Sequence, residues 1–117
     1  MSEDQLINRL KIYKELHPEL KLPVGVNMKD GKRDKVDHWH HFYFYRKESD
    51  QVVKTWVRRI DKERSTFAFV AIFDRSFQHG LKFINKDFDD EENEILKSRF
   101  EEEILVKVVD FSSVLLF

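Results

Sequence analysis

The chain has 117 residues, a mass of 14.2 kDa and no cysteine. This length suits one domain over residues 1–117, and a domain of this size buries enough surface to fold without covalent staples. The lack of cysteine excludes disulfide scaffolds, zinc ribbons, thiolate-held iron–sulfur clusters and cysteine nucleophiles. Hydrophobic residues make up 41% and charged residues 37% of the chain, which is a globular composition and not a disordered one.

The formal net charge of −1 hides an uneven distribution. Residues 1–85 hold 17 basic and 12 acidic side chains, whereas residues 86–103 hold three basic and nine acidic ones. The sequence therefore predicts a mildly basic body with one strongly acidic element. The isoelectric point of about 6.5 lies below the range typical of dedicated nucleic-acid-binding domains.

No targeting segment is expected. The first residues lack the basic and then apolar pattern of a secretory signal. The longest apolar run, residues 67–73, is far too short to span a membrane. We therefore expect a cytoplasmic protein with no membrane partner.

The N-terminal segment is predicted to be a helix over residues 3–16. Ser2 is a favourable N-cap, and Gln5 three residues later completes a capping box. Pro18 ends the helix, because the residue before a proline avoids the helical region. The apolar stripe of this helix consists of Leu6, Ile7, Leu10, Tyr13 and Leu16.

The middle of the chain is predicted to form strands joined by polar turns. The predicted strands are residues 22–28, 37–46, 52–60 and 66–73. The last three, joined by two short turns, indicate an antiparallel meander, and the most apolar of them, 66–73, is expected at its centre. Residues 77–84 are either a further short strand or a loop.

The second predicted helix is acidic and runs from Asp90 to about Glu103. Asp89 is its N-cap and Glu92 completes a capping box. Its apolar stripe is predicted to comprise Ile95, Leu96, Phe100 and Ile104. Residues 105–109 and 114–117 have strand character and predict one more strand, with an extension of the helix as the alternative.

These elements together predict an α+β fold. It consists of an antiparallel β-meander sheet of four to six strands, an N-terminal helix, and the acidic helix near the C-terminus, with both helices on one face. The apolar C-terminal strand at a sheet edge would also allow a homodimer.

The most unusual stretch is the aromatic run at residues 37–45. As a strand with a period of two, it places alternate side chains on opposite faces. One face holds His38, His40, Phe42 and Phe44, and is expected to face the core. The other holds Asp37, Trp39, His41, Tyr43 and Tyr45, and is expected to be partly wet. In the next strand, the same period places Val53, Thr55 and Val57 inward, and Lys54, Trp56 and Arg58 outward.

These outward residues predict a binding surface. Its aromatic members are Trp39, Tyr43, Tyr45 and Trp56, flanked by Lys54, Arg58 and Arg46. Tryptophan, tyrosine and arginine dominate the hot spots of protein interfaces. The same mixture suits single-stranded nucleic acid, through base stacking beside phosphate contacts. The alternative is that the helices cover this face and turn it into a second small core.

A metal site is a further candidate. His38 and His40 share one face of the strand, and two imidazoles at this spacing can converge on one ion. The third ligand would come from His79, Asp74 or a carboxylate of the acidic helix. The alternative is that these histidines are half exposed and cap the end of the core.

No catalytic or cofactor motif is present in the sequence. The serines lack the nucleophile-elbow pattern, and three glycines form no phosphate-binding loop. We therefore expect no cofactor, and a small soluble non-catalytic domain that binds another protein as an inhibitor, immunity protein or adaptor. Five carboxylates would steer association with a basic partner surface: Asp89, Asp90, Glu91, Glu92 and Glu94. The first alternative is nucleic-acid binding by the basic body, and the second is a metal-binding protein or enzyme.

Overall fold

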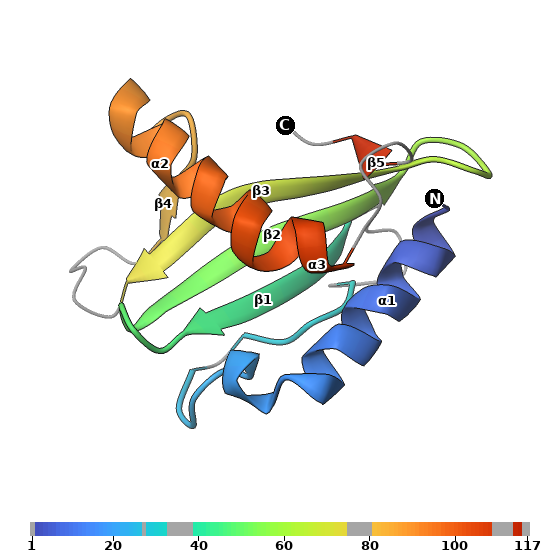
Figure 1. Ribbon diagram of the computed structural model, residues 1–117, viewed down its shortest axis with the longest axis horizontal. Helices are drawn as coiled ribbons and strands as arrows, with labels where there is room; N and C mark the ends of the chain where they lie inside the picture. Colours follow the sequence, from blue (N-terminus) through green and yellow to red (C-terminus); the bar gives the residue numbers. More distant parts are fainter. Residues whose placement is uncertain (1, 27, 33–38, 75–80, 109–113, 116–117) are drawn as a thin grey trace.

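The computed structural model describes residues 2–26, 28–32, 39–74, 81–108 and 114–115. In chain order, its elements are α1 (Glu3–Leu16), η1 (Pro18–Leu20), β1 (His40–Arg46), β2 (Gln51–Arg59), β3 (Ser65–Asp74), β4 (Leu81–Phe83), α2 (Asp90–Phe100), η2 (Glu101–Leu105), α3 (Val106–Val108) and β5 (Val114–Leu115) (Figure 1). This is the α+β arrangement that the sequence predicts: two helical segments packed on a mainly antiparallel sheet.

The first helix has the predicted bounds. The Ser2 hydroxyl accepts a hydrogen bond from the backbone N–H of Gln5 at 3.2 Å, and the Gln5 side chain accepts one from the N–H of Ser2 at 3.0 Å. This closed capping box satisfies N–H groups that have no partner inside the helix. α1 ends at Leu16, and Pro18 begins the short 3₁₀ turn η1.

The strand predicted over residues 22–28 is wrong for the residues that the structure describes there. Val26 donates its N–H to the carbonyl of Pro23 at 3.2 Å, which closes a turn. Gly25 has a φ of +95°, outside the region that a strand requires. Val24, at the tip of the turn, is fully exposed. The described residues of this apolar segment therefore form a turn and do not pair with the sheet.

The sheet is a meander in the order β1–β2–β3–β4, with every neighbouring pair antiparallel. β3 is internal, as predicted, because β2 lies on one side of it and β4 and β5 lie on the other. β5 pairs with the start of β3 in parallel, next to Ser65 and Thr66. β1 begins at His40. Asp37 and His38, at the start of the predicted strand, lie outside the described residues.

The acidic helix begins as predicted but continues further. Asp89 and Glu92 form the capping box, and the helical backbone runs without a break from α2 through one turn of π-helix, η2, into α3. The strand predicted from Leu105 is therefore wrong up to Val108, and the helical alternative is correct there. Its physical reason is burial, because Leu105 and Val108 point into the core at helical spacing and override the strand preference of valine.

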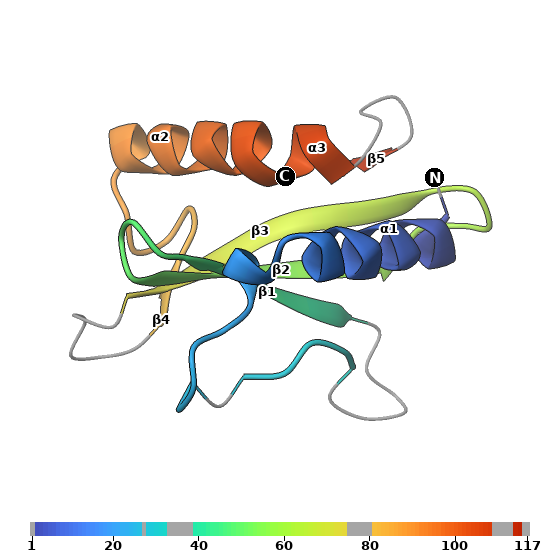
Figure 2. The ribbon, with the colours of Figure 1, turned by 60° about the horizontal axis from the view of Figure 1, so that its bottom comes forward.

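Both helical segments pack on one face of the sheet (Figure 2). Phe100 of α2 lies 5.3 Å from Phe67 and 5.0 Å from Phe69 of β3, measured between ring centroids. The shared core contains Leu6, Leu10, Phe42, Phe44, Val53, Val57, Phe67, Phe69, Ile72, Phe100, Ile104, Leu105 and Val108. Ile95, predicted to belong to the inward stripe, is 53% exposed instead. Within the described ranges, no helix combines the length and hydropathy needed to cross a bilayer.

Candidate interaction face of the sheet

We call the sheet face opposite the helices the outer face. The strand register gives its composition, because residues paired directly across antiparallel strands share a face. His41, Trp56 and Ala68 form one row, and Tyr43, Lys54 and Ala71 form the next. Trp56 packs on a small cluster of Ala68, Val70 and Ala71 that is separate from the main core. The structure therefore places the helices away from the predicted aromatic surface.

Two tryptophans lie together on the outer face. The rings of Trp39 and Trp56 are 4.5 Å apart between centroids and inclined by 38°. The Arg58 guanidinium carbon lies 4.7 Å from the centre of Trp39, and the Lys54 ammonium lies 5.9 Å from the centre of Trp56. Both distances suit cation–π attraction. We call Trp39, Lys54, Trp56 and Arg58 the tryptophan cluster.

The indole of Trp56 has an unusual polar environment. The side chain is only partly exposed, and its Nε1 atom is buried with no hydrogen-bond partner among the residues that the structure describes. A buried donor without an acceptor costs about 1–3 kcal/mol.

The two tyrosines also lie on the outer face. Tyr43 is partly exposed, and its ring lies nearly parallel to that of His41 at 6.5 Å. Tyr45 is partly exposed and donates its hydroxyl to Asp50 at 2.7 Å. His41 is only 3% exposed, so the expectation of a wet side chain is wrong for it. Gly31 lies alongside His41 and exchanges two backbone hydrogen bonds with it, which covers this position.

Arg46, predicted to flank the aromatic surface, lies on the other side of the sheet. Its guanidinium donates to Glu103 of η2 at 2.7 and 3.1 Å, and its side chain is 6% exposed. Position 46 shares the parity of Phe42 and Phe44, so a period of two already placed it on the helix face. The positive charge of Arg46 favours an exposed position, but the ion pair with Glu103 allows its side chain to be buried.

His40, proposed as a metal ligand, lies on the helix face beside Phe42, with the two rings 4.7 Å apart. Asp74, proposed as a third ligand, pairs with Gln51 at the far end of the strands, and α2 begins at that same end (Figure 1). Asp74 and the start of α2 therefore lie away from His40. Within the described parts of the chain, no three histidine or carboxylate side chains gather as a metal site would require. His38 and His79 lie outside those parts.

The environment of His40 predicts a pH effect on stability. Burial, followed by the positive charge of Lys11, holds the pKa of His40 below its ordinary value. The folded state therefore resists a proton that the unfolded chain accepts, so this contribution to stability is present above about pH 6.5 and declines as the pH falls below it. We expect His40→Gln to reduce the loss of unfolding free energy between about pH 7 and about pH 5.5 in urea titrations. His17→Gln, at a partly exposed histidine, is the control, and equal slopes in wild type and His40→Gln would contradict the prediction.

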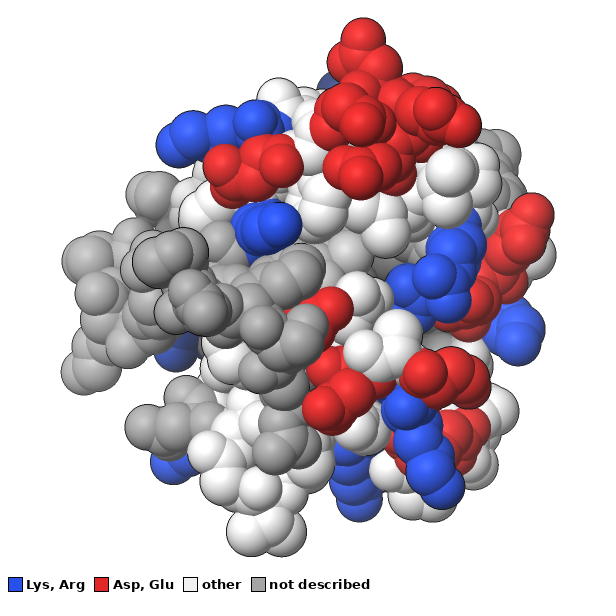
Figure 3. All heavy atoms as spheres, turned by 90° about the vertical axis from the view of Figure 1, so that its left-hand side faces the viewer, with Lys and Arg blue, Asp and Glu red and all other residues white. Residues whose placement is uncertain are grey.

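The acidic side chains at the start of α2 lie on the helix side of the sheet, away from the tryptophan cluster (Figure 2). Figure 3 shows them as a dense patch at the top of the molecule, where α2 begins. The patch includes the predicted Asp89, Asp90, Glu91, Glu92 and Glu94, all of them exposed. Asp89 and Glu92 also close the capping box. The two predicted binding surfaces are thus separate, with the sheet between them.

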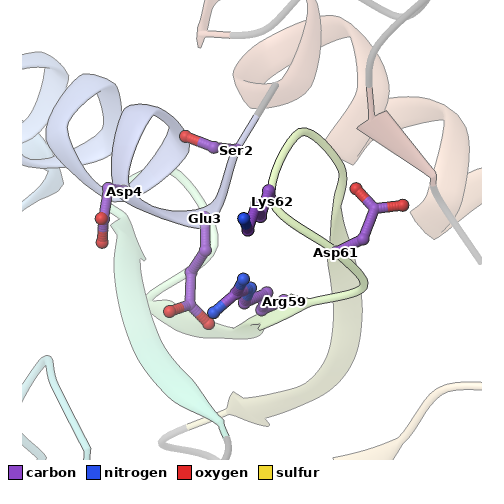
Figure 4. A pocket seen from close by; sticks show the side chains of 6 residues that line it. All are labelled: Ser2, Glu3, Asp4, Arg59, Asp61 and Lys62. Carbon is purple, nitrogen blue, oxygen red and sulfur yellow. The ribbon is translucent and has the colours of Figure 1, made fainter.

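Two cavities lie at the surface. One, of about 330 Å³, lies between the start of α1 and the β2–β3 turn, and in Figure 4 the Arg59 side chain points toward Glu3 within it. Its charges are mixed, since its lining includes Arg59 and Lys62 as well as Glu3, Asp4 and Asp61. The other, of about 550 Å³, lies on the outer face beside His41 and Tyr43. Sequence reasoning gave no signal for this second cavity, because it depends on where residues 28–32 meet β1.

Comparison with protein-family models, with curated proteins and with solved structures gave no match. The chain's own geometry therefore carries the functional argument.

Proposed function

We propose that this chain is a small non-catalytic protein-binding domain of the inhibitor, immunity or adaptor type, and that its partner docks on the outer face. One observation carries the proposal. Both helical segments pack on one side of the sheet, which leaves two tryptophans and two cations together on the side that no described helix covers. Tryptophan and arginine are the residues most enriched in interface hot spots.

The geometry of the tryptophan cluster favours a protein over a nucleic acid. Stacking of a base requires an open aromatic face. Trp39 is contacted by the ring of Trp56 and by the guanidinium of Arg58, and Trp56 also packs on alanines of β3. The cluster therefore offers ring edges and two cations, which suit the mixed polar and apolar surface of a protein partner.

A matched set of variants tests the proposal. We expect Trp56→Ala to weaken partner binding about thirtyfold, because truncation of a hot-spot residue costs 2 kcal/mol or more. Arg58→Glu is expected to weaken it as well, and since Arg58 is exposed this change should leave the fold intact. The control is Val106→Ala, which removes an exposed apolar side chain from α3. The measurement is chemical crosslinking of the tagged protein in its source cells, followed by mass spectrometry and titration with the purified partner.

Folding is followed in parallel by circular dichroism melting. Wild-type affinity in a folded Arg58→Glu variant, or equal losses with Val106→Ala, would contradict the proposed function. The nucleic-acid alternative has its own test, because binding of a single-stranded oligonucleotide would fall steeply with rising salt. Salt-sensitive oligonucleotide binding by the wild type that Arg58→Glu abolishes would replace the protein partner with a nucleic acid.

A further inference from the structure

The cavity on the outer face adjoins the tryptophan cluster. It has a volume of about 550 Å³, within the range of ligand-binding cavities. Its lining includes Met28, Lys29, Asp30, Lys32, His41 and Tyr43. His41 joins it to the cluster, because the edge of its ring meets Trp56 with the centroids 6.1 Å apart. Cavity and cluster are therefore neighbours on the outer face.

The cavity is electrostatically suited to an anion. Among the described lining residues Asp30 is the one carboxylate, and it is already engaged, since it pairs with the Lys14 ammonium at 2.5 Å and accepts the N–H of Tyr43 at 2.9 Å. Lys29 and Lys32 are exposed, and neither forms an ion pair within the part of the chain that the structure describes. Among the described lining residues, two cations without an ion-pair partner thus stand beside one neutralised acid.

The cavity can also hold one side chain of a docked peptide that contacts the tryptophan cluster. Tyr43 offers an aromatic ring and Met28 an apolar side chain, against which the methylene groups of an acidic side chain would pack. Trp56 is on the strand next to His41, and neighbouring strands lie about 5 Å apart. An extended segment of a few residues therefore reaches both places.

We propose that the partner docks through an acidic segment, which places a carboxylate beside Lys29 and Lys32 and a neighbouring apolar side chain against the Trp39–Trp56 pair. This inference rests on the proposed function and names the chemistry of the partner. Lys54 and Arg58 add positive charge on the same face, whereas the acidic patch of α2 lies on the other side of the sheet. This charge distribution steers an acidic segment to the outer face and away from the helices.

Intrinsic fluorescence offers a selective test, because the chain has two tryptophans and both belong to the cluster. The probe is a capped pentapeptide with a central phenylalanine and four glutamates. We expect it to change the tryptophan emission saturably, with a dissociation constant of about 1 mM or tighter. Peptides with four glutamines or four lysines should bind at least tenfold more weakly, and added salt should weaken the glutamate peptide.

A pair of double variants locates the site. Lys29→Glu with Lys32→Glu is expected to weaken the glutamate peptide about tenfold or more. The control is Lys11→Glu with Lys107→Glu, which makes the same change in net charge at exposed positions of α1 and α3. No saturable binding, equal affinity for the three peptides, or equal losses in both double variants would overturn the inference. Tighter binding of a thymidine oligonucleotide than of the glutamate peptide would overturn it in favour of a nucleic acid.

The same double variants separate this inference from the proposed function. If the crosslinked partner is lost with Arg58→Glu but retained with the Lys29 and Lys32 changes, the partner docks on the outer face without an acidic contact in the cavity. That result overturns the inference and leaves the proposed function standing. If Arg58→Glu also retains the partner, both fail.

Discussion

Phe100→Ala is expected to lower the free energy of unfolding by about 3–5 kcal/mol. Phe100 is 3% exposed and its ring contacts both Phe67 and Phe69 of β3. Its removal leaves a cavity between α2 and the sheet that the rigid strand cannot fill. Since domains of this kind are stable by about 5–15 kcal/mol, the loss is a large fraction of the total. Urea unfolding followed by circular dichroism gives the value.

Ile95→Ala is the matched control on the same helix. Ile95 is also apolar, but it is 53% exposed, so its truncation should change stability by less than about 1 kcal/mol. Equal costs for the two variants would mean that α2 does not pack on the sheet through Phe100. The proposal that a partner docks on the tryptophan cluster would then lose its main support, because it depends on which face of the sheet the helices cover.

The helix starts could be predicted from the sequence because each is determined locally. Ser2 with Gln5 and Asp89 with Glu92 place a cap and its reciprocal partner three residues apart, and both capping boxes are present. The inward stripe of α2 was harder to predict. Asn93 takes the position expected for Ile95, because its amide accepts the N–H of Asn85 and donates to the carbonyl of Phe88. A polar side chain fixed by the preceding turn carries no hydrophobic signal.

The incorrect predictions arose where tertiary packing outweighs local preference. Residues 22–26 are apolar but form a turn at Gly25, and Leu105 to Val108 are strand-like in composition but helical in the structure. At residues 105–108, apolar side chains are buried against the sheet. The free energy gained by this burial exceeds the small difference between helix and strand propensity. Neither outcome can be deduced from a window of a few residues.

The candidate site was partly predictable. A period of two correctly separated Trp56 from Val53 and Val57, since a strand alternates its faces regardless of what covers them. The covered face itself could not be deduced, because it depends on how both helices return to the sheet. Lys29 and Lys32 lie between two predicted strands and carry no signal of a site in the sequence. Their place beside His41 follows from the pairing of Gly31 with β1, a long-range contact that no local pattern encodes.

The ion pair between Arg46 and Glu103 leads to the second large stability effect. The Arg46 side chain is 6% exposed, whereas Glu103 is 48% exposed. Glu103→Ala leaves a buried guanidinium without its carboxylate, and we expect a loss of about 2 kcal/mol, less than for a fully buried pair because water reaches this end. Glu102→Ala, an exposed carboxylate one residue earlier, is the control and should change little.

The pair also predicts an asymmetry between its two members. Arg46→Met removes the charge and keeps an unbranched side chain on the helix face, so it should cost less than Glu103→Ala. In the double variant no buried charge is left without a partner, so Glu103→Ala should cost little once Arg46 is methionine. A double-mutant cycle in urea measures this coupling. Additive losses of unfolding free energy would mean that the Arg46 charge is stabilised by groups other than Glu103. β1 and η2 would then be joined by apolar packing alone.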